Sequence, residues 1–396
     1  MNKQFELIKM RVLFTFTYNV SLSIWDETGI IDRDVSLYKE LSKKNVNITF
    51  LTYGNHKDYE YSELLGDIKI FPVSKLIESN IPLLKHIKSL LLPFKLKNFL
   101  KDIDLIKTGQ IYGSWVAIIA KILYKKKVII RSGFEWLRAT KNVFKRNNLK
   151  SFINYLLRYS FIFLNELFAY KLADGIIVTS DYDVPFIMKY YRLKRKYKKN
   201  KIRLIYNYID ESLFKPLPIP KEDKRVIYIG NLHRGKNVIN LTKAFIGLED
   251  FHLDIIGEGP DKEKMEEIAD QNKLNINFLG LFPNSKIPEI LNQYQIFILP
   301  SIDEGNPKVL LEAMSCGIAC IGTNIEGINN IIKHKKNGYL CETTPESIRE
   351  AIKTVYKDVN LRKNIAKQAR EFILNNCSLK KITESEYSFY REILNR

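Results

Sequence analysis

The feature that most constrains the fold is a regular alternation of short apolar runs with longer amphipathic stretches. In the second half of the chain, runs of five or six residues with few charges alternate with segments whose apolar residues recur at helical spacing. A strand–helix–strand order of this kind builds a parallel sheet. The predicted strands are 225–229, 251–256, 275–279, 296–300 and 318–322, and the predicted helices are 237–248, 263–272, 288–294 and 308–316.

The first half repeats the same alternation. Its predicted strands are 11–16, 46–52, 104–107, 127–130 and 175–179, and its clearest helices are 34–44 and 115–124. The apolar stretch 155–170 is interrupted by charged and amide residues, so we interpret it as a helix packed on the sheet. Two α/β domains, each a doubly wound parallel sheet, account for both halves, with a joint near the proline-bearing segment 215–220. Ligands of such sheets bind beyond the carboxyl ends of the strands, so we expect a shared site in a cleft between the domains.

Composition excludes several other classes of protein. The chain has 396 residues, of which 45% are hydrophobic and 27% charged, which argues against disorder. Its four cysteines form no disulfide framework and no paired C-x-x-C metal site, a pattern typical of a reducing compartment. We find no signal peptide and no run of the about 18 to 20 apolar residues that spans a bilayer. The expected location is therefore cytoplasmic.

The positive charge is concentrated in the first half. Residues 1–200 carry 35 Lys and Arg against 18 Asp and Glu, whereas residues 201–396 carry 28 against 26. The densest stretches are 85–101, 141–150 and 192–201, and the first interleaves Lys with Leu and Phe. An anionic membrane surface and an ordinary solvated surface both fit this pattern. Nucleic-acid binding is disfavoured because no known nucleic-acid module occurs.

Two loops of the second half carry residues suited to bind a phosphorylated ligand. The segment 231–237 (NLHRGKN) follows a predicted strand and precedes a helix, which places Arg234 and Lys236 beside free helix amides. A solvated loop remains the alternative, and no P-loop motif occurs. The segment 257–260 (GEGP) permits close backbone approach, although a simple turn explains it almost as well.

The segment 299–317 (LPSIDEGNPKVLLEAMSCG) carries the strongest signal. It places Glu304 in a loop at a strand end and Glu312 on the following helix. Amides near Asn306 could hold a diphosphate, with Glu304 accepting from sugar hydroxyls and Glu312 from ribose hydroxyls. A purely structural acidic loop is the alternative.

In chain order, five segments resemble the donor half of the GT-B glycosyltransferases of family 4, which are retaining enzymes that use nucleotide-activated sugars. The resemblance covers residues 202–345 and rests on 205–210 with Phe214 and Pro216, 228–237, 254–260, 278–280 and 299–317. It implies an α/β GT-B fold, with two doubly wound, Rossmann-like parallel-sheet domains facing a cleft. Residues 1–208 would bind the acceptor, 209–375 would bind the nucleotide sugar, and the helix 376–396 would pack back on the first domain.

The resemblance also assigns roles to individual residues. Lys236, Glu304 and Arg234 would act on the reacting groups. Asn231 stands where the family has Arg, and the family's first-half His is absent. The donor-binding residues would be Asn231, Gly257, Gly259, Phe282, Gly305, Asn306, Pro307, Lys308, Val309 and Glu312, and the candidate cleft residues would be Gly29, Arg131, Glu135 and Asn207.

The implied reaction moves a hexose-type sugar from a UDP- or GDP-linked donor to an acceptor hydroxyl, with no cofactor and no metal. We interpret the triplets Asp32/Asp34, Asp102/Asp104 and Asp181/Asp183 as turn or helix-start carboxylates. The expected acceptor is a saccharide or a lipid-linked saccharide of polysaccharide or lipopolysaccharide assembly, at the inner face of an anionic membrane. A GT-B epimerase or phosphorylase, and a non-catalytic sugar- or nucleic-acid-binding scaffold, remain alternatives. The sequence leaves the oligomeric state open.

Overall fold

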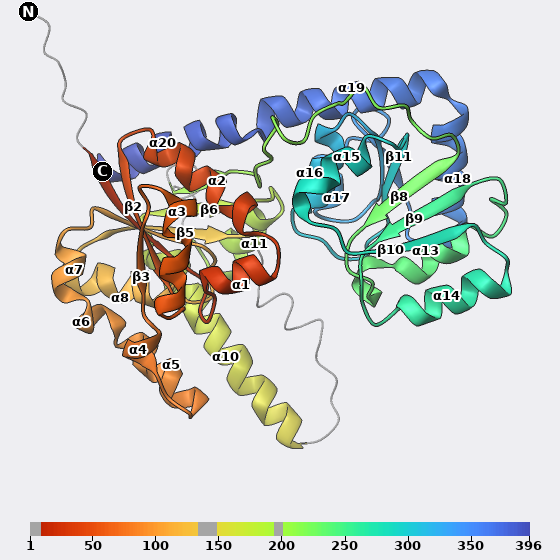
Figure 1. Cartoon of the computed structure of the whole chain (residues 1–396). Helices are drawn as coiled ribbons and strands as arrows, with labels where there is room; N and C mark the ends of the chain where they lie inside the picture. Colours follow the sequence, from red (N-terminus) through yellow and green to blue (C-terminus); the bar gives the residue numbers. More distant parts are fainter. Residues whose placement is uncertain (1–8, 134–148, 194–200) are drawn as a thin grey trace, which may run out of the picture. The chain divides into compact units, whose positions relative to one another are not determined.

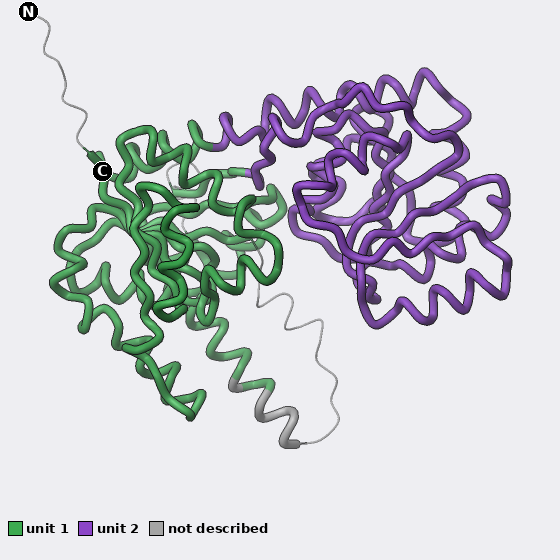
Figure 2. The backbone as a smooth tube through the Cα atoms, in the orientation of Figure 1, with its two compact units in different colours: residues 1–205, 383–396 green, residues 206–382 purple. Residues whose placement is uncertain are grey.

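The computed structural model describes residues 9–133, 149–193 and 201–396. The chain forms two compact units: unit 1 comprises residues 1–205 and 383–396, and unit 2 comprises residues 206–382 (Figure 2). The chain therefore enters unit 2 once and returns to unit 1 within the last helix. The boundaries expected from the sequence lay after residues 208 and 375.

Unit 1 is built on a seven-stranded sheet with the order β3-β2-β1-β4-β5-β6-β7 (Figure 1). All neighbouring strands are parallel, and the chain order reverses between β1 and β4, which makes the sheet doubly wound. The five strands predicted for this half are confirmed, and β3 and β7 were missed. The strands are β1 (Met10–Thr15), β2 (Val46–Thr52), β3 (Lys69–Pro72), β4 (Leu105–Thr108), β5 (Lys127–Ser132), β6 (Gly175–Val178) and β7 (Ile202–Leu204).

The predicted helix 115–124 is present as α8, with five buried residues in its first six positions. The stretch 155–170 lies within the longer helix α10. Within the described ranges, no helix combines the length and the apolar character that a membrane crossing requires. The described helices of unit 1 are α1 (Leu22–Glu27), α2 (Ile31–Ser42), η1 (His56–Tyr61), α3 (Ser62–Leu65), α4 (Ser74–Ile77), α5 (Pro82–Leu90), α6 (Leu92–Lys95), α7 (Lys97–Lys101), α8 (Trp115–Tyr124), α10 (Leu149–Leu172) and α11 (Asp183–Tyr190).

Unit 2 is built on a six-stranded parallel sheet with the order β10-β9-β8-β11-β12-β13. The chain order reverses between β8 and β11, so this sheet is also doubly wound, as predicted. Every residue of the central strand β11 is buried, as expected where helices cover both faces. The strands are β8 (Arg225–Ile229), β9 (His252–Ile256), β10 (Ile276–Gly280), β11 (Ile296–Leu299), β12 (Ala319–Thr323) and β13 (Tyr339–Cys341), the last of which was not predicted.

The helices of unit 2 follow its strands. The predicted helices 237–248, 263–272, 288–294 and 308–316 appear as α13, α14, α15 and α16, and the first and third are shorter than expected. The last helix, α20 (Leu379–Leu394), begins in unit 2 and continues in unit 1. The helices of unit 2 are η2 (Arg234–Lys236), α13 (Val238–Ala244), α14 (Lys262–Gln271), η3 (Asn284–Lys286), α15 (Ile287–Leu291), α16 (Lys308–Ser315), α17 (Ile328–Ile331), α18 (Pro345–Lys357) and α19 (Val359–Asn376).

Candidate active site

Two loops at the carboxyl ends of neighbouring strands of unit 2 lie in direct contact. The Leu232 amide, after β8, donates to the Glu258 carbonyl, after β9, at 2.9 Å. A Cβ atom on Gly257 would lie 2.0 Å from the Gly230 carbonyl oxygen, and one on Gly259 would lie 2.2 Å from that of Leu232. Both glycines are therefore required by the close packing of these loops, whatever ligand they border.

The loop after β8 continues into the short helix η2. His233 caps this helix, because its Nδ1 atom accepts from the Gly235 amide at 3.1 Å. The Ile302 amide, from the loop after β11, donates to the Gly235 carbonyl at 3.0 Å. Asn237 follows in a left-handed conformation with φ of 58°, and its side chain donates to the Thr343 carbonyl. These bonds fix η2 beside the loop that follows β11.

Within this frame, the Lys236 and Glu304 side chains form an ion pair. The distance from Nζ to Oε1 is 2.5 Å, and the side chains are only 23% and 9% exposed. The hydroxyl of Ser301 donates to the same Oε1 atom at 2.8 Å. The hydroxyl of Thr323 in turn donates to the Ser301 carbonyl. A cation and a carboxylate predicted from separate segments are thus held together at the sheet edge.

The backbone that follows Glu304 is also held by neighbouring residues. The Asn207 side-chain amide donates to the Asn306 carbonyl at 2.8 Å. Gly327, with φ of +88°, approaches so closely that a Cβ atom there would lie 2.3 Å from the Glu304 carbonyl oxygen. Ser301 and Gly327 were not among the residues predicted from the sequence. The available signals were the Ser three residues before Glu304 and the Gly that precedes α17.

The helix α16 starts directly after this loop. Pro307 is its N-cap residue and is buried. The ammonium of Lys308 lies 5.6 Å from the centre of the Tyr208 ring. Glu312 is only 4% exposed, and burial together with the Glu312 carboxylate raises the pKa of the nearby Cys316 thiol to about 12. Val309 is half-buried.

The remaining predicted donor residues lie at the surface of unit 2. Asn231, Arg234 and Gly305 are exposed, and among the described residues the Arg234 guanidinium has no hydrogen-bond or ion-pair partner. Phe282 follows β10 and is 41% exposed, beside the more exposed Leu281. The Tyr228 hydroxyl donates to the Asn231 carbonyl at 3.0 Å.

The candidate cleft residues of the first half lie in unit 1 or outside the described residues. Gly29 is exposed after α1. Arg131 pairs instead with Glu386 of α20, at 3.4 Å. Glu135 lies outside the described residues.

The side chains that could bind a metal ion are dispersed over the described residues. Among the described residues, no three His, Cys, Asp or Glu side chains gather closely enough to hold a metal ion. Asp32, Asp34 and Asp183 lie in the first turns of helices, and Asp104 pairs with Arg11. All four cysteines are buried free thiols.

Comparisons with known proteins cover nearly the whole chain. Residues 35–213 match the family described as Glycosyltransferase Family 4, and residues 209–372 match the family described as Glycosyl transferases group 1. N-acetyl-alpha-D-glucosaminyl L-malate synthase of Bacillus anthracis is 29% identical over 245 residues, which is 58% of this chain and 63% of that protein, so the match spans less than two thirds of this relative.

Two further similarities extend over most of the chain. An N-acetylgalactosaminyltransferase of Campylobacter jejuni, named for its diphospho-undecaprenol-linked acceptor, is 24% identical over 370 residues, covering 91% of this chain and 94% of that protein. HepE of Anabaena, solved in complex with UDP, superposes with a TM-score of 0.74 at 15% identity, covering 96% of this chain and 100% of that one. At this identity the structural likeness shows the fold alone.

Proposed function

Because the chain belongs to the family 4 glycosyltransferases and has their GT-B fold, we propose that it transfers a sugar from a nucleoside-diphosphate donor to an acceptor hydroxyl with retention of anomeric configuration. The observation that carries the proposal is the Lys236–Glu304 pair at the carboxyl edge of the unit 2 sheet. Ligands of doubly wound sheets bind at this edge.

The proposed mechanism begins with an exchange of partners. When a diphosphate binds, the Lys236 ammonium donates hydrogen bonds to it. Lys236 then no longer pairs with Glu304 alone. The Glu304 carboxylate, still held by Ser301, then accepts hydrogen bonds from hydroxyls of the donor sugar. The acceptor oxygen bonds to the anomeric carbon as the sugar–phosphate bond breaks, and the acceptor's proton passes to the departing diphosphate, on which negative charge develops. Lys236 and the exposed Arg234 stabilise that charge.

Backbone and helix groups complete the proposed donor site. The amides of Gly305, Asn306 and Lys308 are the proposed backbone donors to the diphosphate, whereas Pro307 between them has no N–H. The ribose hydroxyls bind the buried Glu312 carboxylate, and the segment 281–283 borders the base of a UDP- or GDP-linked sugar. In this proposal cationic side chains and amides stabilise the leaving group, so no metal and no cofactor is required.

The proposed acceptor is a lipid-linked saccharide of surface polysaccharide or lipopolysaccharide assembly. The name of the Campylobacter relative, which covers nearly the whole chain, supports a polyprenyl-diphosphate acceptor. The proposed location is the inner face of an anionic membrane. In support, α5 and α6 expose Leu83, Ile87 and Phe94 among the lysines of the stretch 85–101.

The test is a transfer assay with UDP- and GDP-linked sugars and a polyprenyl-diphosphate saccharide, with the product's anomeric configuration read by NMR. We expect Lys236→Ala to lower kcat by about 10²- to 10³-fold, as the loss of one transition-state donor does. Glu304→Gln should also lower kcat, because a neutral amide oxygen is a weaker acceptor for the sugar hydroxyls than a carboxylate. Lys262→Ala, which removes an exposed ion pair with Glu258, is the control and leaves the rate unchanged.

Three outcomes would contradict the proposal. Unchanged transfer rates in both variants would show that Lys236 and Glu304 do not take part in the reaction. An inverted anomeric product would remove the retaining mechanism. Conversion of the donor sugar without an acceptor would favour an epimerase.

A further inference from the structure

Unit 2 contains a cavity at the edge of its sheet opposite to the candidate active site. The cavity has a volume of about 630 Å³, and Gln295 and Ala319 in its wall lie at the amino ends of β11 and β12. The candidate active site lies at the carboxyl ends of the same sheet. The four-residue strand β11 alone separates the two edges by about 13 Å, at ~3.3 Å per residue. Small side chains, including Gly317 and Ala366, leave the space open.

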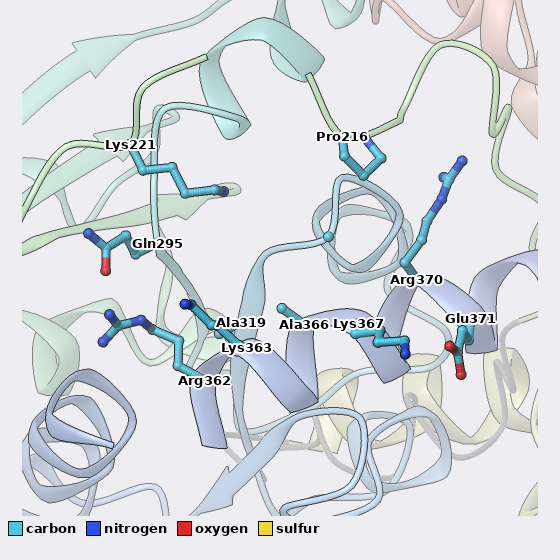
Figure 3. A pocket seen from close by; sticks show the side chains of 11 residues that line it. Pro216, Lys221, Gln295, Ala319, Arg362, Lys363, Ala366, Lys367, Arg370 and Glu371 are labelled. Atoms are coloured by element: carbon cyan, nitrogen blue, oxygen red, sulfur yellow. The ribbon is translucent and has the colours of Figure 1, made fainter. Parts of the chain in front are cut away.

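The wall of this cavity is strongly basic. Helix α19 contributes Arg362, Lys363, Lys367 and Arg370, whose spacing places them on one face of the helix. Figure 3 shows that Lys221 and Gln295 reach the cavity from other segments of unit 2. Glu371 is the one carboxylate of the lining, and it already accepts from the side chain of Gln368.

Arg362 and Arg370 donate hydrogen bonds to backbone carbonyls of unit 2. Arg370 donates to the carbonyls of Phe214 and Ser315 at 2.7 and 2.8 Å. Arg362 donates to the carbonyl of Tyr356, at the end of α18. Their role is therefore to fix the cavity wall, and their charge contributes to the field inside it.

The lysines, in contrast, retain capacity to bind a ligand. Lys363 and Lys367 are exposed, and neither side chain has a hydrogen-bond or ion-pair partner among the described residues. They are four residues apart on one helix, a like-charge spacing that destabilises the helix unless an anion binds between them. Lys221 donates to the Tyr294 carbonyl at 2.8 Å, which leaves two of its three N–H groups.

A neutral acceptor accompanies these cations. The side-chain oxygen of Gln295 is buried and has no donor among the described residues, although its amide nitrogen lies 3.4 Å from the Glu222 carbonyl. A buried acceptor without a donor is costly, and a ligand hydroxyl would satisfy it. A hydroxyl separated from the anionic group can donate to this oxygen while the anionic group binds the lysines.

We propose that this cavity is a second ligand site, which binds a small phosphorylated polyol. The phosphate lies on the ammonium groups of Lys363, Lys367 and Lys221, and a hydroxyl of the ligand donates to the Gln295 oxygen. The volume is within the range of small-molecule sites, about 300 to 1,000 Å³. Desolvation in the cavity wall lowers the pKa of Lys221, and a bound anion would offset that effect. The site does not depend on the proposed transfer reaction.

The test is a calorimetric titration of the full chain with glycerol 3-phosphate, inorganic phosphate and glycerol as probes. We expect saturable binding of glycerol 3-phosphate that is tighter than that of phosphate, and no binding of glycerol. The double variant Lys363→Glu with Lys367→Glu should weaken the binding of both anions by about 10- to 100-fold, because two charge-assisted contacts are lost. Gln295→Met should reduce the affinity for glycerol 3-phosphate to that for phosphate.

Matched variants separate this site from the candidate active site. Lys264→Glu with Lys336→Glu changes the charge of unit 2 equally, at exposed lysines outside the cavity lining, and should leave binding intact. Lys236→Ala should also leave the binding of glycerol 3-phosphate intact, while it lowers the rate of sugar transfer. The two proposals can therefore fail independently of each other. The inference is overturned if the wild type does not bind glycerol 3-phosphate, if the cavity variant binds as the wild type does, or if Lys236→Ala abolishes binding.

Discussion

At the scale of single residues, Gly257 and Gly247 differ in what surrounds them. Both have positive φ values, 151° and 86°. A Cβ atom on Gly257 would lie 2.0 Å from a backbone oxygen, whereas one on Gly247 would meet its nearest atom at 3.6 Å. A side chain at position 257 would therefore overlap with the backbone of a neighbouring loop. At position 247 a side chain is disfavoured only by the positive φ.

This difference predicts unequal losses of stability. Gly247→Ala should cost about 1–2 kcal/mol of unfolding free energy, the backbone penalty alone. Gly257→Ala should cost about 1–3 kcal/mol more, because the loops after β8 and β9 must separate. Urea unfolding of both variants measures the difference. Equal midpoints would show that the two loops are not packed as described.

The residues of the site were only partly predictable. Lys236 and Glu304 could be chosen from the sequence because each lies in a segment with phosphate- or sugar-binding character. The ion pair between them could not be predicted, because 68 residues separate them in the sequence and only the strand order of the sheet brings β8 beside β11. Ser301 and Gly327 were missed because their roles depend on contacts with the side chain and the carbonyl of Glu304, which become evident only in the folded loops.

At the scale of elements, α20 is attached to unit 1 by a buried ion pair. Lys107 of β4 and Glu386 of α20 are fully buried, with 2.5 Å between Nζ and Oε2. Burial lowers the pKa of Lys107 to about 8. Burial also opposes ionisation of Glu386, but Lys107 and Arg131 outweigh it and lower the pKa of this carboxyl.

Removing one partner of the Lys107–Glu386 pair should therefore lower the free energy of unfolding substantially. Lys107→Met leaves Glu386 as a buried charge with Arg131 and the Tyr390 hydroxyl still beside it, and should destabilise the protein by about 3–5 kcal/mol. Lys44→Met, which removes an exposed pair with Glu384 on the same helix, should cost at most about 1 kcal/mol. Thermal or urea unfolding compares the two variants, and similar losses would show that the buried pair does not hold α20.

The elements also differ in how well the sequence predicted them. The predicted strands could be found because their apolar runs are long enough to stand out from the helices between them. The missed strands β3, β7 and β13 lie at the edges of their sheets and have one buried residue each, whereas the predicted four-residue strands β4, β6 and β11 are buried throughout. Strand β3 also ends in a proline. Their place in the sheets depends on the neighbouring strand, which local periodicity does not reveal.

At the scale of the whole molecule, the uneven charge of the sequence predicts membrane binding through unit 1. Of the exposed apolar residues on α5 and α6, Leu83 is 71% and Phe94 54% exposed. We expect binding to anionic vesicles that weakens steeply with salt. Leu83→Ser with Phe94→Ser should weaken it by about tenfold or more, because burial of such a side chain contributes about 1.5–3 kcal/mol.

A vesicle sedimentation assay measures this prediction. The control is Val359→Ser, which changes an exposed apolar residue of unit 2 and should leave binding unchanged. Equal binding to neutral and anionic vesicles would contradict the electrostatic contribution. Equal binding of the unit 1 double variant and the wild type would contradict insertion of α5 and α6.

We propose that the carboxyl edge of the unit 2 sheet binds the sugar nucleotide. A crystal structure of the full chain with its donor tests it most directly. We expect the diphosphate within hydrogen-bond distance of Lys236 Nζ and of the amides after Glu304, with a sugar hydroxyl on the Glu304 carboxylate. A donor bound elsewhere, with Lys236 and Glu304 still paired only to each other, would contradict the account.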